Sequence, residues 1–112
     1  MKEVKRPWGN FKEFVKNKKS TVKILEVKPD SMLSLQKHKH RDEMWYFLTP
    51  GFVQLGEKSK PRRVKKGDIV NIPKTKAHRL MSKKSKVVVL EVSLGKFSEN
   101  DEIRIEDKYG RR

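Results

Sequence analysis

Three histidines are the residues of this sequence best suited to chemistry, and two of them lie two positions apart. His38 and His40 stand close together, and His78 follows after a long interval. Side chains two apart on a β-strand point to the same face, so Gln36, His38 and His40 share a face if one strand carries them. Grouped imidazoles of this kind are typical of a metal site.

The donors that this chain can offer to a metal are nitrogen and oxygen atoms, because it contains no cysteine. Glu43 can supply a carboxylate. It lies an odd number of positions from His38, however, and joins the same face only if a turn or bulge in residues 39–42 intervenes. Such a donor set predicts one divalent transition metal ion, with zinc favoured and manganese, cobalt, nickel or iron as alternatives.

The elements that must position these donors are short β-strands. Compact runs of β-branched and aromatic residues are separated by turn-forming dipeptides, a pattern that predicts an all-β fold, an antiparallel sandwich or barrel. After residue 97 the pattern weakens and predicts a turn of helix or an extended arm. The expected strands are 21–27, 32–37, 43–48, 52–55, 63–64, 68–72, 77–81 and 87–93.

The length of 112 residues allows one hydrophobic core, so we expect a single domain covering 1–112. It divides into an N-terminal arm (1–20), a barrel (21–96) and a C-terminal segment (97–112). No apolar run approaches the roughly 20 residues needed to cross a bilayer, and the N-terminus lacks the apolar core of a signal peptide. We therefore expect a cytoplasmic protein without a membrane partner.

The formal net charge of +15 indicates an anionic partner, with nucleic acids and phosphorylated small molecules as the leading classes. Lysine clusters in 16–19, 58–66 and 83–86 alternate with the expected strands, which is typical of solvated loops. No aromatic residue is interleaved with them for base stacking. This distribution disfavours nucleic acid as the partner.

Two segments resemble the paired motifs of the cupin family. In the first motif a glycine precedes His-x-His by five residues, and a glutamate and a closing glycine follow. Here Gln36 stands at the first histidine position, His38 at the second, Glu43 at the carboxylate and Gly51 at the close. Residues 67–82 resemble the second cupin motif. The resemblance implies a cupin-type antiparallel β-barrel, that is, a double-stranded β-helix or jelly roll.

Further signatures narrow the resemblance to the isomerase domain of the type II phosphomannose isomerases. In bifunctional members this domain follows a mannose-1-phosphate guanylyltransferase domain, whose glycine-rich nucleotide loop has no counterpart here, so we expect no nucleotide transfer. The signatures are Arg6-Pro7-Trp8-Gly9, Leu33-Ser34-Leu35-Gln36, His38-x-His40-Arg41-x-Glu43-x-Trp45, Ile72-Pro73, His78-Arg79-Leu80 and Asp107-x-Tyr109-Gly110-Arg111.

Three positions depart from the family pattern. Asp30 replaces the usual glycine of the first motif, Thr75 replaces a glycine of the second, and Ser82 replaces its final asparagine. A β-branched residue tolerates the left-handed backbone poorly, so Thr75 is the departure that most suggests a different local turn. We expect it to alter the rim of the pocket more than the metal site.

The resemblance also implies the metal ligands. They are Gln36, His38, Glu43 and His78, which leave coordination positions open for water or substrate. An alternative set has His40 in place of Gln36, with Gln36 outside the coordination sphere.

The implied reaction is the interconversion of mannose 6-phosphate and fructose 6-phosphate by enediol proton transfer. His40 is a candidate base, because its ordinary pKa lies near neutrality, and it is equally suited to orienting a ligand. Arg41 and Arg104 are candidates for holding phosphate or stabilising the enediolate. Lys39, Trp45 and Tyr109 complete the predicted substrate-binding set, although a large aromatic residue in a barrel more often belongs to the core.

The alternative function is a non-enzymatic cupin that binds a sugar phosphate or another small anion. An isomerase needs an open coordination position beside a base, whereas a sensor needs only the pocket. In either case we expect a homodimer, because a small barrel exposes sheet edges and the apolar residues of the arm in 6–14 can be covered by a partner.

Overall fold

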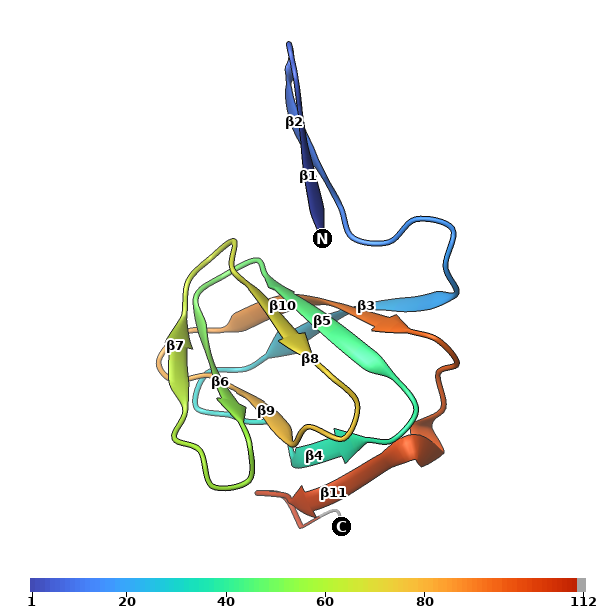
Figure 1. The fold of residues 1–112 in the computed structure, drawn as a ribbon. Coiled ribbons are helices and arrows are strands. Elements are labelled where there is room, and N and C mark those ends of the chain that lie inside the picture. Colours follow the sequence, from blue (N-terminus) through green and yellow to red (C-terminus); the bar gives the residue numbers. More distant parts are fainter. Residues whose placement is uncertain (111–112) are drawn as a thin grey trace.

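The computed structural model describes residues 1–110, and within them it contains eleven strands in three antiparallel sheets (Figure 1). One 3-10 turn, η1 (Glu99–Asp101), precedes the last strand. No helix of the described part is long and apolar enough to cross a membrane. The strands are β1 (Lys2–Arg6), β2 (Gly9–Glu13), β3 (Ser20–Val27), β4 (Leu35–His38), β5 (Asp42–Phe47), β6 (Gly51–Leu55), β7 (Arg62–Val64), β8 (Ile69–Ile72), β9 (His78–Met81), β10 (Val87–Leu94) and β11 (Glu102–Glu106).

Two sheets form the barrel, and the hydrophobic core lies between them. One sheet has the order β3-β10-β5-β8 and the other β11-β4-β9-β6-β7. Their inward side chains alternate with outward ones, as the period of two requires. Phe47 and Val89 from the first sheet and Val53 and Leu80 from the second are each 0% exposed. The all-β antiparallel fold expected from the sequence is confirmed, and each of the eight expected strands is present.

The strand that carries the His38 segment is shorter than the sequence suggested. The expected strand covered 32–37, whereas β4 covers Leu35–His38 and a bend follows it. His40 therefore does not continue the strand, and the prediction that it shares a face with Gln36 and His38 is wrong. The next strand, β5, begins at Asp42 in the opposite sheet, so the chain changes sheets in 39–41.

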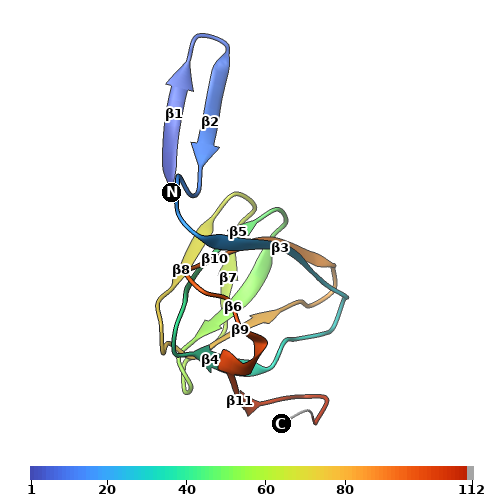
Figure 2. The same ribbon diagram turned by 90° about the vertical axis from the view of Figure 1, so that its right-hand side faces the viewer.

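Both ends of the chain form structure that the sequence pattern did not specify. β1 and β2 pair into a hairpin that projects away from the barrel (Figures 1 and 2). The C-terminal segment contains both features that were considered, a helical turn in η1 and an extended strand in β11. β11 pairs with β4 and thereby extends the five-stranded sheet beside the predicted ligands.

Two of the three departures from the family pattern have the left-handed backbone that glycine adopts without strain. Asp30 has φ 55° and Thr75 has φ 67°, both in the left-handed region. The expectation of a different turn at Thr75 is therefore wrong, because this residue keeps the left-handed backbone. A residue with a Cβ adopts that conformation at a cost of about 1–2 kcal/mol. The Thr75 amide donates a hydrogen bond of 2.6 Å to the carbonyl oxygen of His38, which ties this turn to the end of β4.

Candidate metal centre

The four predicted ligands meet inside the barrel. Gln36 and His38 point inward from β4, and His78 on β9 pairs directly with Gln36 across the sheet. Glu43 comes from β5 in the opposite sheet (Figure 1). The change of sheet in 39–41 supplies the turn that Glu43 needed in order to face His38. The structure thus brings together donors from two sheets, and all four are buried.

The distances within this group suit one ion. Glu43 Oε1 lies 3.7 Å from His38 Nε2 and 3.6 Å from His78 Nε2. One candidate donor atom from each of the three residues lies within 4.8 Å of the others. Donors that bind a common ion at about 2.0–2.2 Å are separated by about 3–4 Å, so these side chains need little movement to coordinate it.

His78 is held with its free nitrogen toward the centre. Its Nδ1 lies 2.8 Å from the carbonyl oxygen of Lys76, and a carbonyl only accepts, so Nδ1 carries the proton. Nε2 then keeps its lone pair on the side of Glu43. Burial lowers the pKa of His78 below its ordinary value, which favours the neutral ring that a metal requires. A backbone carbonyl that fixes the tautomer is typical of a metal-binding histidine.

His38 is likewise neutral. The pKa of His38 is lowered to about 4, and burial is the largest cause. The negative charge of Glu43 raises this pKa, whereas the positive charge of Arg41 lowers it further. Its Nε2 lies 3.3 Å from the Arg41 guanidinium, which only donates, so this nitrogen carries a lone pair. The ring is therefore in the protonation state of a ligand over the whole neutral pH range.

Arg41 also fixes the orientation of Glu43. Its Nε donates to Glu43 Oε2 at 3.0 Å, and the Ser93 hydroxyl donates to the same oxygen at 3.1 Å. Oε1 is thereby left to face the two histidines. Arg41 itself is 4% exposed and donates a further hydrogen bond of 3.1 Å to the Ser98 carbonyl. A guanidinium held in this way contributes fixed positive charge beside the centre.

The four predicted ligands share an unusual feature: each has a buried polar atom without a hydrogen-bond partner. Within residues 1–110 these atoms are Gln36 Oε1, His38 Nδ1, Glu43 Oε1 and His78 Nε2. A buried unpartnered polar group costs about 1–3 kcal/mol, so the three that carry lone pairs, Gln36 Oε1, Glu43 Oε1 and His78 Nε2, call for a common partner. His38 Nδ1 carries the ring proton, so Nε2 is the atom that His38 offers to an ion. Two imidazoles, a carboxylate and an amide oxygen fit a divalent transition metal, and this fit includes Gln36 without requiring His40.

Sequence reasoning missed four charged or aromatic residues that line the cavity at this centre, besides the apolar Leu25 and Leu33. The four are Lys23 from β3, Glu91 from β10, Glu102 from β11 and Phe97 from the segment between the last two strands. Glu91 had a detectable signal, because it is an acidic residue at an inward position of an apolar run. Glu102 faces the centre because β11 pairs it with His38, and residues paired directly across a sheet share a face. Phe97 had no such signal.

Glu91 is a buried carboxyl group whose protonation is set by this environment. Burial, followed by repulsion from Glu43, raises the pKa of Glu91 to about 7, although the Trp45 indole donates to Glu91 Oε2 at 3.1 Å and opposes the shift. The unfolded chain is expected to titrate near the ordinary value of 4.5. The folded state therefore binds the proton more tightly than the unfolded state does.

Glu91→Gln is accordingly expected to change how the stability of the metal-free protein depends on pH. Between about pH 4.5 and 7 the unfolded chain releases this proton before the folded chain does, so the wild-type free energy of unfolding falls as pH rises. From pH 4.5 to 8 the variant should gain on the order of 3 kcal/mol relative to wild type. Urea unfolding in chelator at several pH values measures this gain. Glu57→Gln, at an exposed site, is the control, and equal pH profiles for both variants would contradict the assignment.

His40 and Lys39 lie outside the cavity, in the exposed bend after β4. Their backbone amides donate to the two carboxylate oxygens of Asp101 at 3.0 and 2.9 Å respectively. Together with η1 they border a separate surface hollow. The structure therefore does not bring the predicted base or Lys39 to the predicted ligands.

The other predicted substrate contacts are distributed around the centre. Arg104 is paired with Gln36 across β11 and β4, and its Nε lies 2.7 Å from Glu102 Oε2 at the rim. Trp45 is 1% exposed and packs edge-on against His78 with ring centroids 5.5 Å apart, which makes it a core residue beneath the site. Tyr109 is 54% exposed and lies beyond β11. Arg111, which ends the last signature, lies outside the described residues.

Comparison with known proteins assigns the family. The family model described as the C-terminal domain of mannose-6-phosphate isomerase matches residues 1–107. The chain belongs to this family. The resemblance drawn from the sequence signatures is thereby confirmed.

Curated relatives of this mannose-6-phosphate isomerase C-terminal domain cover nearly its whole length. The alginate biosynthesis protein AlgA of Pseudomonas aeruginosa is 36% identical over 111 residues, which are 97% of this chain and 23% of AlgA. The mannose-1-phosphate guanylyltransferase ManC of Salmonella typhimurium is 32% identical over 112 residues, 98% of this chain and 23% of ManC. The chain spans about a quarter of the length of these relatives.

Solved structures show the fold of the domain. A double-stranded β-helix protein from Klebsiella pneumoniae matches with a TM-score of 0.63 and 17% identity, covering 71% of this chain and 70% of that one. A cupin 2 conserved barrel protein from Salinispora arenicola matches with a TM-score of 0.60 and 18% identity, covering 68% and 63%. The cupin-type barrel expected from the two motifs is confirmed.

Proposed function

We propose that this domain is a metal-dependent sugar-phosphate isomerase that interconverts mannose 6-phosphate and fructose 6-phosphate. Membership of the mannose-6-phosphate isomerase C-terminal family supports the reaction class. The observation that carries the proposal is the group of three unpartnered atoms with lone pairs, Gln36 Oε1, Glu43 Oε1 and His78 Nε2, beside His38 and a buried arginine. A divalent metal held there would supply Lewis acidity, and the arginine supplies fixed positive charge beside it; a proton shift between C1 and C2 of a sugar requires both.

The ligands of the proposed site are Gln36, His38, Glu43 and His78. A zinc ion or another divalent transition metal bound there would polarise the sugar oxygens on C1 and C2. Arg41 stabilises negative charge on the enediolate, because its guanidinium is held at the cavity wall by Glu43 and by the Ser98 carbonyl. These contacts orient the guanidinium before substrate arrives, so little reorganisation is needed during the reaction.

Proton transfer is assigned to the carboxylates of the cavity, in place of His40. Glu91 and Glu102 both line it, whereas His40 lies in the exposed bend. Glu102 lies next to Arg104, whose positive charge at the rim suits the phosphate group of a bound sugar. The high net positive charge of the chain favours the approach of such an anionic substrate.

The experiment is an isomerisation assay with control of the metal content. Mannose 6-phosphate is supplied to purified protein, to chelator-treated protein and to chelator-treated protein reloaded with zinc, manganese, cobalt, nickel or iron(II). Fructose 6-phosphate is expected to form only with metal present, and the His38→Ala variant should fail to recover activity on reloading. Metal-loaded protein that binds mannose 6-phosphate without converting it would contradict the proposal and support the alternative, a non-enzymatic binding module.

A further inference from the structure

A cavity of about 580 Å³ lies at the end of the barrel opposite the metal centre. Glu43 and His78 lie at the beginnings of β5 and β9. Most of the cavity wall is formed by residues 49–52 and 83–87, which follow the ends of the same two strands, and Arg63 of β7 completes it. The cavity at the metal centre measures only about 110 Å³. Small-molecule sites commonly enclose roughly 300–1,000 Å³, so the larger cavity has room for a whole small ligand.

This cavity is separate from the barrel core. Gly51 packs so closely against the core that a Cβ there would lie 2.8 Å from the side chains of both Phe47 and Val87. Next to it on β6, Phe52 is paired with Arg63 of β7, and residues paired directly across a sheet share a face. That face is the outer one, because the residue that follows each of them belongs to the core. An aromatic ring and a guanidinium group are therefore neighbours on the outside of the barrel.

Among the described residues, four cationic side chains and no carboxylate line the cavity. The cations come from two basic clusters that are far apart in the sequence, 58–66 and 83–86. Lys86 forms an ion pair of 3.1 Å with Glu26, and within the described part of the chain the other three have no carboxylate partner. Like charges gathered in this way attract an anion. The four are Arg63, Lys83, Lys84 and Lys86.

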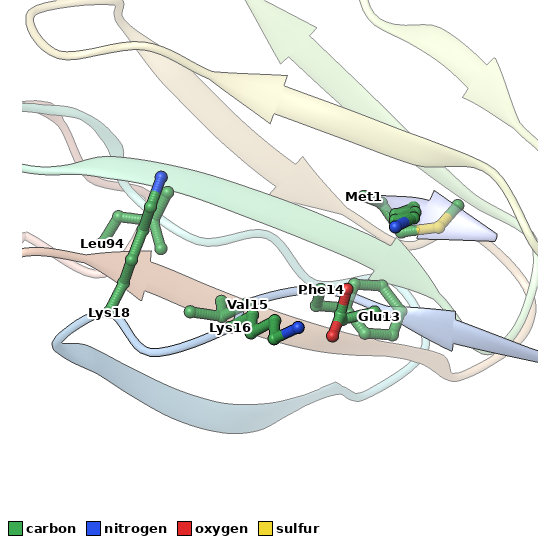
Figure 3. Close-up of a pocket in the computed structure, with 8 residues that line it drawn as sticks. Met1, Glu13, Phe14, Val15, Lys16, Lys18 and Leu94 are labelled. Atoms are coloured by element: carbon green, nitrogen blue, oxygen red, sulfur yellow. The ribbon is translucent and has the colours of Figure 1, made fainter. Parts of the chain in front are cut away.

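A second hollow, beside residues 13–18, has a different composition. Figure 3 shows Glu13 there together with Lys16 and Lys18, so a carboxylate offsets part of the positive charge. The aromatic ring of this hollow, Phe14, already packs edge-on against Tyr46 with ring centroids 5.2 Å apart. The cavity at the far end of the barrel is therefore the better candidate for an anion.

The apolar part of the lining indicates what the anion is attached to. Pro50, Phe52 and Val87 supply apolar surface, and Lys83 Nζ lies 4.5 Å from the centre of the Phe52 ring. Positive charge is thus directly beside an aromatic surface. A ligand in which a flat ring is bonded to the anionic group can contact both at once.

A sugar phosphate fits this lining less well than an aromatic phosphate does. The hydroxyls of a sugar need hydrogen-bond partners when they are enclosed. The Thr49 hydroxyl is already engaged, because it donates to the Pro50 carbonyl at 2.9 Å and accepts from the Val88 amide at 3.0 Å. Ser85 supplies the other hydroxyl group of the lining. The ligand of this cavity therefore differs in class from the substrate proposed for the metal centre.

We propose that this cavity is a second binding site, which takes an aromatic phosphate. The ring packs against Phe52 and Pro50, and the phosphate lies among Arg63 and the three lysines of 83–86. Phosphate suits this group of cations because it carries up to two negative charges and because a guanidinium fork matches its oxygen atoms. The site does not depend on the proposed isomerase reaction, since no residue that lines it also lines the cavity at the metal centre.

The test is calorimetric titration of the full chain with 2-naphthyl phosphate, which joins a fused aromatic ring to a phosphate. The protein is treated with chelator first, so that no metal contributes to binding and the result is independent of the isomerase proposal. Inorganic phosphate has the charge without the ring, and 2-naphthol has the ring without the charge. Naphthyl phosphate should bind at least about tenfold more tightly than either, because ring burial and charge attraction act together. Its affinity should fall as salt is added.

Matched variants locate the binding. Arg63→Ser with Lys84→Ser removes two exposed cations of the cavity and should weaken binding at least about tenfold. Lys58→Ser with Lys60→Ser removes the same charge from an exposed loop outside the cavity and should have little effect.

Phe52→Leu tests the ring independently, because it keeps apolar volume and removes the aromatic face. It should weaken binding of naphthyl phosphate and leave the weak binding of inorganic phosphate unchanged. Naphthyl phosphate that binds no more tightly than inorganic phosphate would overturn the proposal. Binding that the cavity and loop variants weaken equally would also overturn it, because attraction to net charge alone would then explain the result.

Discussion

Replacing His78 by alanine is expected to reduce the divalent metal content from about one ion per chain to nearly zero. His78 is fully buried, and its only free nitrogen faces Glu43 while the other is held by a backbone carbonyl. Elemental analysis of desalted protein measures the loss. Chelation should lower the thermal midpoint of wild type and leave that of the folded variant unchanged, because bound metal stabilises only the folded state.

Matched variants identify the remaining ligands. His38→Ala is expected to behave as His78→Ala does, and Gln36→Ala should weaken metal binding because its Oε1 is one of the four unpartnered atoms. His40→Ala is the control, since His40 is exposed in the bend and should leave the metal content unchanged. Full metal occupancy in both His38→Ala and His78→Ala would place the site elsewhere. Loss of metal in His40→Ala would restore the alternative ligand set.

Replacing Arg41 by alanine is expected to lower kcat/KM for mannose 6-phosphate by roughly two to three orders of magnitude, the loss typical of one electrostatic donor in an enclosed site. The guanidinium is buried, and its carbon lies 4.3 Å from the centre of the Phe97 ring. Metal should still bind at saturating concentration, because a guanidinium is not a ligand and the Ser93 hydroxyl still holds Glu43 Oε2. Steady-state kinetics with parallel metal analysis therefore separates the two roles.

Two further substitutions make the Arg41 result specific. Arg41→Lys keeps the positive charge but loses the planar guanidinium group that donates to both Glu43 and the Ser98 carbonyl. The activity of this variant should lie between that of wild type and that of the alanine variant. Arg62→Ala removes an equal charge from the exposed surface of β7 and controls for net charge. An Arg41→Ala enzyme as fast as wild type would show that this arginine has no part in turnover.

The strands of the barrel could be predicted because their sequences carry the pattern of buried sheet. Runs such as 87–93 contain β-branched residues at consecutive positions, and proline or glycine follows or precedes most runs. β1 and β2 could not be found in this way. Their sequences, KEVKR and GNFKE, have little apolar alternation, because no layer of this chain covers them.

The sequence alone was sufficient to propose the donors, because the spacing of Gln36, His38, Glu43 and His78 resembles the cupin motifs and the absence of cysteine leaves only nitrogen and oxygen ligands. It also determined that His38 and Gln36 share a face, since both lie within β4. It could not determine where the strand ends. The period of two predicted that His40 faces the centre, but the chain leaves the strand after His38 and enters the other sheet.

Only the tertiary structure decided which atoms converge and in what state. Glu43 faces His38 and His78 because β5 lies in the sheet opposite β4 and β9, a relation that depends on long-range strand pairing. The raised pKa of Glu91 likewise depends on burial beside Glu43, which a neighbouring strand supplies. Local sequence determines which groups are available and how they alternate along a strand. Distances between sheets, and the electrostatic environment they create, arise only when the barrel closes.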